Sequence, residues 1–456
     1  MAQDFDRRDF FKHGVTAAAA LALGAAAGSK ANAAPLTAPP SMIPAPRLDH
    51  VRIGIIGVGG RGTSHVRNVL RLDGATLTAA CDLVPGKVEN VQKLTVEAGQ
   101  PKPKGYSDGP EAYKALCQQA DVDVVYIATP WELHVPMAVE AMNNGKHAYV
   151  EVPAAVTVDE CWQLVEVSEK TGLHCVMMEN ACYGEPELTV LNICRQGLLG
   201  TLVNAECGYL HDLRGLKFSD KGEGPWRTPH TVKRNGNLYP THGLGPVSEY
   251  SNINRGDQFD YMISMSSRTG GLNQYAINEF GESDPRAKIQ YKCGDVNSSL
   301  IRTKSGITIL LVHDCNLPRP YSRKNVIQGT KGIFEGYPDR IYLEHRSEPH
   351  TWQPRWARDG PFSEYMADYR HPLWKLLGEE AIGGGHGGMD FLMNYRFIES
   401  FHKGRYPDFD VYDAAAWSVV SPLSEESVAG GGKPVAVPDF TRGKWKTNKP
   451  IFIADM

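Results

Sequence analysis

Residues 51–62 read VRIGIIGVGGRG. The first six residues are a short, largely β-branched run typical of a buried strand, and a stretch compatible with a helix follows the glycines. In a G-x-G-x-x-G turn between strand and helix, Gly57 permits the tight turn, Gly59 lets the backbone approach a pyrophosphate, and Gly62 lets helix and strand pack closely. The stretch therefore predicts a dinucleotide-binding unit. The alternative is a glycine turn in an unrelated α/β domain.

A carboxylate follows at the spacing that such a unit requires. A second strand, residues 75–81, ends at Asp82, about 20 residues beyond the last glycine. There a carboxylate bonds both ribose hydroxyls and repels a 2′-phosphate. Asp82 therefore favours NAD as the cofactor over NADP.

The same alternation continues along the first half of the chain. We expect strands at 122–128, 147–150 and 173–178, and helices at 134–144 and 158–171. This order builds a parallel sheet with right-handed crossovers. Ligands of such sheets lie beyond the carboxyl ends of the strands, so we expect the cofactor cleft to be lined by residues 129–134, 151–153 and 179–180.

From about residue 200 the pattern changes to short strands with polar turns. We expect these strands at 202–209, 289–291, 298–303, 308–314 and 325–329. They predict a large, mostly antiparallel open sheet, one face of which closes over the cofactor. The predicted fold is thus α/β, with an N-terminal Rossmann domain at 34–180 and a substrate-binding α/β domain at 181–456.

The N-terminus resembles a twin-arginine export signal. Residues 6–12 read DRRDFFK, a weakly hydrophobic alanine-rich run spans 15–27, and Ala31-Asn32-Ala33 supplies a peptidase pattern, although other Ala-x-Ala registers exist. We therefore expect a signal peptide at 1–33, contact with the export machinery, and a periplasmic or extracytoplasmic mature protein. The alternative is an accidental basic start to a cytoplasmic chain.

The nine scattered cysteines contain no C-x-x-C pair and are interpreted as buried thiols. Twin-arginine transport moves folded proteins, which reconciles such thiols with export and lets a cofactor be loaded first. Outside the cytoplasm no nicotinamide pool exists, so an exported NAD enzyme must hold its cofactor and regenerate it within each turnover.

Composition excludes several partners. The formal charge is -4, and no basic cluster is interleaved with aromatic residues, so we expect neither nucleic acid nor a membrane surface as partner. The run at 15–27 is too short for a stable membrane anchor. No histidine and carboxylate cluster has metal-ligand spacing, so we predict no metal. The sequence leaves a homo-oligomer open.

Three motifs together resemble the Gfo/Idh/MocA oxidoreductases: the glycine turn, the A-T-P-x-x-x-H segment at 128–134, and E-x-P at 151–153. The resemblance implies a Rossmann domain joined to an α/β domain with an open sheet. In the usual dehydrogenases of the family a lysine occupies the middle of E-x-P and handles the substrate hydroxyl proton. Here the residue is Val152, which carries no proton, so simple dehydrogenase chemistry would need another group.

From Arg52 to near the C-terminus the chain resembles, more closely, the NAD-dependent α-N-acetylgalactosaminidases of glycoside hydrolase family 109. The segments that carry the resemblance are ENACYG at 179–184, Trp226-Arg227, GNLYPTHGLGP at 236–246, GDQFDYM at 256–262, and Tyr321-Ser322-Arg323. The resemblance implies a redox-neutral glycosidase that acts on N-acetylgalactosamine-terminated glycans or glycosides. NAD⁺ takes hydride from C3, a base removes the acidified C2 proton, the C1 substituent is eliminated, and water and hydride are then added.

The same residue-by-residue match implies the site. His242, in a glycine-rich turn, is the leading acid/base because imidazole titrates near neutrality, and Tyr183 is the second catalytic candidate. The alternatives are a loop histidine and a core tyrosine. The implied sugar contacts are Tyr209, Arg227, Tyr239, Pro240, Thr241, His242 and Tyr321. The cofactor contacts, with Gly57 and Gly59 from the turn, are Arg61, Gly62, Asp82, Trp131, Glu132, Leu133, His134, Glu151, Val152, Asn180 and Trp226.

Two alternatives to the glycosidase remain: an exported NAD-dependent sugar oxidoreductase, against which Val152 counts, and a non-catalytic sugar- or nucleotide-binding protein. The run GGGHGG at 383–388 has two interpretations, a mobile flap that brings His386 to the substrate or a solvated loop, and we leave it outside the catalytic set.

Overall fold

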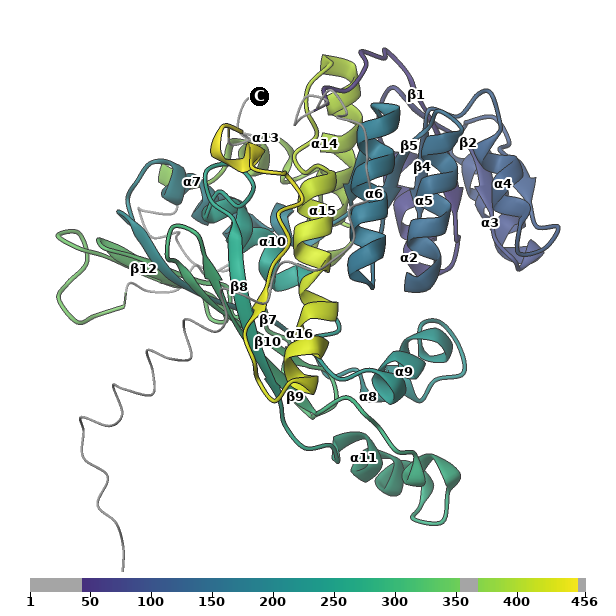
Figure 1. The fold of residues 1–456 in the computed structure, drawn as a ribbon. Helices are drawn as coiled ribbons and strands as arrows, with labels where there is room; N and C mark the ends of the chain where they lie inside the picture. Colours follow the sequence, from purple (N-terminus) through teal and green to yellow (C-terminus); the bar gives the residue numbers. More distant parts are fainter. Residues whose placement is uncertain (1–42, 353–367, 450–456) are drawn as a thin grey trace, which may run out of the picture. The chain divides into compact units, whose positions relative to one another are not determined.

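The computed structural model describes residues 43–352 and 368–449 (Figure 1). The predicted signal peptide at 1–33 lies outside the described residues. Within them, each helix is too short or too polar to cross a lipid bilayer.

The first sheet has six strands, all parallel, in the order β3-β2-β1-β4-β5-β6. The strands are β1 Val51–Ile56, β2 Ala75–Cys81, β3 Lys104–Tyr106, β4 Val124–Ile127, β5 His147–Val150 and β6 Cys175–Met177. This is the strand order of a doubly wound dinucleotide-binding sheet. The chain adds strands on one side of β1 up to β3 and then continues on the other side with β4. The Rossmann fold is therefore confirmed, and we expect the cofactor at the carboxyl ends of β1, β4, β5 and β6, where ligands of such sheets bind.

Helices connect the strands of this sheet. They are α2 Gly60–Val69, α3 Pro85–Glu97, α4 Ala112–Cys117, α5 His134–Asn143 and α6 Val158–Thr171. Helix α6 has the predicted bounds because both ends carry local stop signals. Thr157 and Glu160 form a capping box at its start, and Gly172 adopts a left-handed conformation (φ 69°) at its end.

The second sheet has eight strands, in the order β13-β12-β11-β7-β10-β9-β8-β14, and the β7–β10 pair is parallel while the other pairs are antiparallel. Its strands are β7 Leu202–Leu210, β8 Phe259–Ser266, β9 Val296–Thr303, β10 Thr308–Asp314, β11 Val326–Gly329, β12 Gly332–Glu335, β13 Arg340–Leu343 and β14 Val435–Ala436. The predicted large, mostly antiparallel sheet is confirmed.

The predicted strand at 289–291 is wrong. Asn273, on helix α11 (Gly271–Phe280), donates hydrogen bonds to the carbonyls of Ala287 and Ile289, so side-chain bonds occupy part of the backbone there. Directly after this segment, the backbone N–H groups of residues 292 and 293 donate to carbonyls near the end of helix α9 (Gly224–Lys233). The strands missing from the prediction are β8, which pairs with β9, and the short strands β3, β12, β13 and β14.

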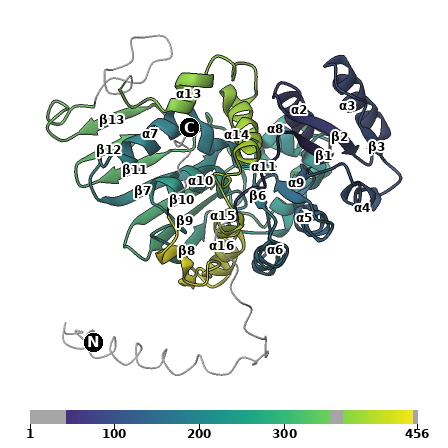
Figure 2. The same cartoon turned by 90° about the horizontal axis from the view of Figure 1, so that it is seen from above.

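Helices from the second half of the chain lie between the two sheets (Figures 1 and 2). They are α10 Thr241–Tyr250, α14 Met389–Lys403, α15 Val411–Ser418 and α16 Val420–Ala429. Helix α14 packs against α2, α15 against α6 and β6, and α16 against β8. The boundary at residues 180 and 181 separates the strands of the two sheets, but α14 and α15 pack on first-half elements, so the domain ranges remain a prediction.

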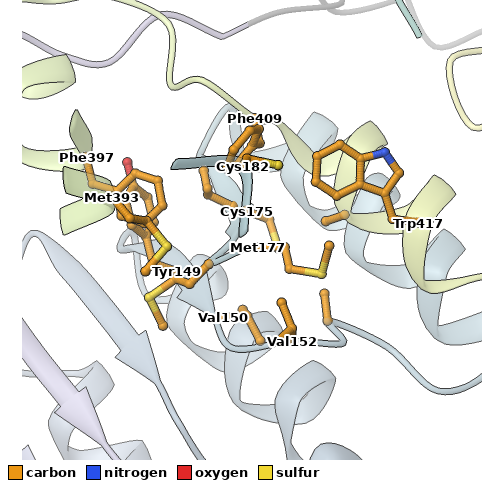
Figure 3. Close-up of a cluster of buried hydrophobic side chains, with 14 of the residues drawn as sticks. Tyr149, Val150, Val152, Cys175, Met177, Cys182, Met393, Phe397, Phe409 and Trp417 are labelled. Carbon is orange, nitrogen blue, oxygen red and sulfur yellow. The ribbon is translucent and has the colours of Figure 1, made fainter. Parts of the chain in front are cut away.

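Figure 3 shows how the two halves share a core. Tyr149 of β5 packs edge-on against Phe397 of α14, with ring centroids 4.8 Å apart. Val152 belongs to the same cluster and is buried with Met177 and Trp417. Its aliphatic side chain therefore serves packing.

All nine cysteines are free thiols, and eight are buried, which confirms the prediction of buried thiols for those eight.

Candidate active site

The glycine turn after β1 has the geometry that a bound pyrophosphate requires. Gly57 adopts φ 84°, and a Cβ there would lie 2.4 Å from the carbonyl oxygen of Ala128. A Cβ on Gly62 would lie 1.9 Å from the Gly57 oxygen, so helix α2 can pack this closely only with glycine. Around Gly59 and Gly60 the space is open, with no heavy atom nearer than the Lys87 Nζ at 4.0 Å from a Cβ on Gly59. The turn thus presents free backbone and the start of α2 to a phosphate.

Asp82 is held beside this turn. The N–H groups of Val58 and Val84 each donate to its carboxylate at 3.0 Å, and the Lys87 Nζ lies 3.6 Å away. The carboxylate is thus fixed next to the glycine turn, where the predicted ribose contact requires it.

The predicted contacts Arg61 and Asn180 meet at a carboxylate that the sequence analysis missed, Asp390 of α14, and Arg61 also joins the predicted contact Glu151 to it. Arg61 donates to Glu151 (Nε to Oε1, 2.5 Å) and to Asp390 (Nη1 to Oδ2, 2.6 Å). Asn180 donates to the other oxygen of Asp390 at 2.7 Å. His65, fully buried, bonds Glu151 at 2.7 Å. This chain of contacts ties the carboxyl ends of β5 and β6 to α2 and α14.

Charge within this network is fixed. Burial opposes ionisation of Glu151, but the Arg61 guanidinium and the His65 bond outweigh it and lower the pKa of that carboxyl to about 2. Burial likewise opposes the charge of Asp390, while bonds to His386 and Arg61 hold its pKa below the ordinary value. Glu151 and Asp390 are therefore anionic at neutral pH and are positioning groups, not proton carriers.

The loop after β4 contributes one aromatic ring and one structural histidine. Trp131 is buried, whereas Glu132 and Leu133 are largely exposed. His134 is buried, its two nitrogens lie 2.8 Å from the carbonyl oxygens of Thr129 and Pro153, and burial lowers its pKa. The imidazole thus holds two strand-end loops together, and the cofactor contact at His134 stays a prediction.

Three aromatic rings surround Arg227, and a fourth packs on one of them. The guanidinium carbon lies 4.7 Å from the Tyr239 ring centroid, 5.2 Å from Trp131 and 5.8 Å from Tyr209, and Trp226 packs on Trp131 at 5.3 Å. We call these five residues the aromatic cage. The structure thus brings together three predicted sugar contacts and two predicted cofactor contacts.

The charge of Arg227 is balanced by a carboxylate beside the cage. Its Nη1 lies 2.5 Å from Glu223, a carboxylate missed by the sequence analysis. Burial opposes the charge, but the nearby Tyr209 and Glu223 outweigh it and raise the pKa of the guanidinium. A cation flanked by aromatic faces suits a polar ligand with an apolar C–H surface, as in a sugar ring.

His242 borders the cage and is oriented by a buried carboxylate. Its ring centroid lies 4.9 Å from Tyr239 and 5.4 Å from Tyr209. Its Nδ1 donates to Glu179 Oε1 at 2.6 Å, and Glu179 is fully buried at the end of β6. The pair leaves His242 Nε2 available for proton transfer, the arrangement of a carboxylate-oriented general acid or base.

Glycines in the segment THGLGP make this geometry possible. A Cβ on Gly243 would lie 2.5 Å from the backbone nitrogen of Gly208 on β7. A Cβ on Gly245 would lie 2.8 Å from the side chains of Cys182 and Glu179. Helix α10 can therefore approach both β7 and Glu179 closely. Pro240 and Thr241 are buried at the start of α10, and their predicted sugar contacts stay a prediction.

Tyr321 extends the aromatic surface outward. It is 38% exposed, and its ring lies 5.0 Å from His211 and 6.3 Å from Tyr209. The Tyr209 hydroxyl lies 2.9 Å from His211 Nδ1. His211 is thus another imidazole at the site that the sequence analysis did not single out.

Tyr183 is placed differently from the other candidates. It is fully buried, its ring packs on Phe397 and Phe409, and its hydroxyl donates to Asp408 at 2.8 Å. Burial, and then the negative charge of Asp408, raise the pKa of the phenol. This placement gives Tyr183 a packing role, and the prediction that it acts on substrate receives no support from it.

Among the described residues, no group of three or more His, Cys, Asp or Glu side chains could hold a metal ion.

Two family models match the chain. Residues 51–179 match the NAD-binding Rossmann fold of the oxidoreductase family Gfo/Idh/MocA, and residues 183–447 match the C-terminal domain of glycosyl hydrolase 109. A glycosyl hydrolase family 109 protein of Shewanella pealeana is 48% identical over 456 residues, covering 98% of this chain and 99% of the relative. One from Shewanella amazonensis is 48% identical over 457 residues, covering 99% of each.

Solved structures share the fold at low sequence identity. A levoglucosan dehydrogenase in complex with NADH and L-sorbose superposes with a TM-score of 0.65 at 18% identity, covering 86% of this chain and all of that one. An NAD-binding oxidoreductase from Klebsiella pneumoniae gives a TM-score of 0.65 at 16% identity, with the same coverage. These structures show the shared fold, and the family model at residues 51–179 shows that this part of the chain is an NAD-binding Rossmann domain.

Proposed function

The chain belongs to the glycosyl hydrolase 109 family, and from that premise we propose that it hydrolyses terminal α-N-acetylgalactosamine residues by an NAD-dependent, redox-neutral route. The observation that carries the proposal is the His242–Glu179 pair, which stands against the aromatic cage of an NAD-binding protein. A cage that binds a sugar beside an oriented imidazole suits proton transfer on a sugar ring.

NAD, when bound, supplies the oxidant that takes the C3 hydride and later returns it. The residues present fit the cofactor: the glycine turn leaves the backbone open to a pyrophosphate, and Asp82 is held ready for the ribose. Arg61 and Asn180 are fixed at the edge of the cleft by Asp390.

The chain's own groups perform the acid and base work. The aromatic rings pack on the C–H face of the sugar, and Arg227 donates to its acetamido or hydroxyl oxygen. His242 Nε2 removes the C2 proton once C3 is a ketone, and the same imidazole returns a proton to the leaving oxygen at C1. Glu179 holds Nδ1 protonated and stabilises the imidazolium that forms.

An exported sugar oxidoreductase is the competing function. Its net oxidation would need a supply of oxidised cofactor outside the cytoplasm. We further propose export by the twin-arginine route to the periplasm, which agrees with a reaction that regenerates its own cofactor.

One experiment tests the proposal. The purified mature protein is incubated in deuterated water with aryl N-acetylgalactosaminides of both anomers. We expect release of the phenol from the α-anomer, deuterium at C2 of the product, and no net NADH. Net NADH with an intact glycoside would establish the oxidoreductase instead. Hydrolysis without C2 deuterium would refute the elimination route.

A further inference from the structure

The aromatic surface of the site continues beyond the aromatic cage. Tyr321, whose ring centroid lies 6.3 Å from that of Tyr209 in the cage, has a second aromatic neighbour, Tyr337, at 6.0 Å and an interplanar angle of 67°. We call Tyr321 and Tyr337 the tyrosine shelf. Tyr209 and Tyr239 of the cage are 6% and 8% exposed, whereas Tyr321 and Tyr337 are 38% and 39% exposed. The shelf therefore leads from the buried cage toward solvent.

The topology of the second sheet brings the two tyrosines to the same edge. Strands β7 and β12 are both antiparallel to β11, which lies between them, so they run in the same direction (Figure 2). Their carboxyl ends therefore lie at one edge of the sheet. Tyr337 follows the end of β12, and Tyr321 lies at the end of β7 because its neighbour Ser322 pairs with Leu210.

The turn that carries Tyr337 is held against the start of β11. The Gly336 N–H donates to the Asn325 carbonyl at 3.1 Å, and a Cβ on Gly336 would lie 2.9 Å from the Lys324 carbonyl oxygen. Tyr337 has φ 62°, in the left-handed region that residues other than glycine rarely adopt. Such a conformation persists where the surrounding contacts enforce it. The backbone of Tyr337 is thus fixed next to Tyr321.

A buried cation contacts both rings of the shelf. The guanidinium carbon of Arg323 lies 5.8 Å from the Tyr321 ring centroid and 5.7 Å from that of Tyr337, and Nη1 donates to the Tyr321 hydroxyl at 3.3 Å. Nη2 donates to Glu187 Oε1 at 2.6 Å, and the Arg323 and Glu187 side chains are 8% and 2% exposed. The ion pair holds the two rings from their buried side, so their outer surface is left to a ligand.

The charges around the shelf favour an uncharged ligand. Burial raises the pKa of both phenols, so Tyr321 and Tyr337 are neutral at neutral pH. Charged side chains of the flanking segments are paired with one another: Lys324 lies 2.9 Å from a Glu206 oxygen, and Arg340 lies 2.9 Å from a Glu335 oxygen. Recognition on the shelf therefore depends on aromatic surface and not on a counter-charge.

A sugar ring suits such a surface. Tyrosine rings pack on the C–H face of a sugar, and they offer a large, rigid contact area at a small cost in conformational entropy. In the proposed function the terminal sugar occupies the cage, and its C1 substituent must extend out of the cage toward solvent. The shelf is exposed aromatic surface that continues from the cage, and it can receive that substituent.

We propose that the tyrosine shelf binds the sugar unit attached to C1 of the terminal N-acetylgalactosamine, and that Tyr337 thereby selects neutral oligosaccharides over simple glycosides. This inference rests on the proposed function. Tyr337 contributes binding and takes no part in bond breaking. Arg323 is a positioning residue that keeps both rings in place.

The test compares two substrates that differ only in what C1 carries. One is methyl α-N-acetylgalactosaminide, whose aglycone has no ring, and the other is a disaccharide in which the same sugar is α-linked to a neutral hexose. The NAD-loaded enzyme, Tyr337→Ala and Tyr337→Phe are assayed for release of N-acetylgalactosamine, which gives kcat/KM for each substrate. Tyr406→Ala, at a 42% exposed tyrosine, is the control, and urea midpoints report stability.

We expect Tyr337→Ala to lower kcat/KM for the disaccharide by about tenfold, the size of effect that the loss of one ring contact produces. Its kcat/KM for the methyl glycoside should stay within about twofold of the unsubstituted enzyme, because that substrate does not reach Tyr337. Tyr337→Phe keeps the ring and should cleave both substrates normally, as should Tyr406→Ala.

An equal effect of Tyr337→Ala on both substrates would overturn the inference, because the ring would then serve the terminal sugar or the fold. An unchanged kcat/KM for the disaccharide would overturn it as well. If, in addition, light scattering showed that Tyr337→Ala associates less than the unsubstituted enzyme, the shelf would be assigned to contact with a second copy of this chain.

The proposed function fails separately, if the unsubstituted enzyme cleaves neither substrate. Calorimetric titration of the two glycosides then decides the inference without turnover. Weaker binding of the disaccharide alone to Tyr337→Ala would support a sugar site on the shelf, and equal binding to both proteins would refute it.

Discussion

Arg61 Nη1 lies 2.6 Å from Asp390 Oδ2, although 329 residues separate them in the chain. The contact joins the glycine turn that opens α2 to the first turn of α14. Since the same Arg61 also holds Glu151, one guanidinium links three segments that surround the cofactor cleft.

Asp390→Asn should weaken cofactor binding. The substitution keeps the shape of the side chain but leaves Arg61 without one of its two counter-charges, and breaking such a buried pair costs about 3–5 kcal/mol. Part of that cost destabilises the NAD-bound protein more than the free protein. We therefore expect the dissociation constant of NAD to rise by about tenfold or more. The measurement is NAD retained after gel filtration, followed by titration of the stripped protein.

Asp108→Asn is the matched control, because it makes the same substitution at an exposed position. Equal NAD retention in the two variants would show that Asp390 does not position the cofactor contacts.

Glu179→Gln should reduce kcat with little change in KM. Glu179 is buried and orients His242 without facing the sugar, so its carboxylate matters for proton transfer more than for binding. Replacing the orienting acid of a carboxylate–imidazole pair by its amide lowers kcat by about 10²–10⁴-fold. Steady-state kinetics on the aryl α-glycoside give both constants.

Exposed Glu97→Gln serves as the control for that experiment. A rise in KM of the same size as the fall in kcat would place Glu179 in direct contact with the sugar, contrary to the geometry.

Local elements could be predicted closely because their signals are local. The capping box at Thr157 and the left-handed Gly172 gave α6 its bounds, and the glycine turn with Asp82 located the cofactor half. The predicted contacts around Arg227 also meet in space. The prediction missed β8, and it also missed β3, β12, β13 and β14; each of these last four has four residues or fewer and so shows too short an alternation to be recognised.

Pairs distant in sequence could not be predicted. No periodicity indicates that His242 meets Glu179 or that Arg61 meets Asp390, since each contact depends on how α10 and α14 pack between the sheets. Tyr183 is the converse case: its place after β6 predicts a role at the cleft, but a short 3-10 turn at Asn180–Tyr183 directs its ring into the core. The His386–Asp390 contact could not be predicted from the i,i+4 spacing either, because His386, Gly387 and Gly388 all have positive φ and lie outside a regular helix.

The protein should lose stability in mild acid through His147. Burial, and then the neighbouring His174, lower the pKa of His147 to about 3. An unfolded histidine has a pKa of about 6.5. Between pH 6.5 and pH 3, His147 is protonated in the unfolded chain but neutral in the folded chain. The stability contributed by neutral His147 is therefore present above about pH 6.5 and is lost as pH falls toward 3.

His147→Gln should therefore flatten the pH dependence. One such histidine contributes about 1.4 kcal/mol per pH unit, or about 2 kcal/mol between pH 6.5 and 5. Urea unfolding of stripped protein at these two pH values measures the difference, with His345→Gln, at an 89% exposed side chain, as control. An unchanged pH dependence in His147→Gln would mean that His147 titrates normally in the folded protein.

Tyr183→Phe distinguishes a core role from a catalytic one. The substitution removes only the hydroxyl that donates to Asp408, while Arg396 continues to bond both oxygens of that carboxylate. Loss of a buried hydrogen bond to a charged group costs about 1.5–3 kcal/mol, so we expect a lower urea midpoint with kcat within about twofold of the unsubstituted enzyme. Tyr395→Phe, which removes a half-buried hydroxyl bonded to Glu399 on the same helix, is the control. A fall in kcat of about 100-fold or more with the urea midpoint unchanged would instead assign the phenol to proton transfer, and the Tyr183 side chain would then have to leave its pocket beside Phe397 and Phe409 during turnover.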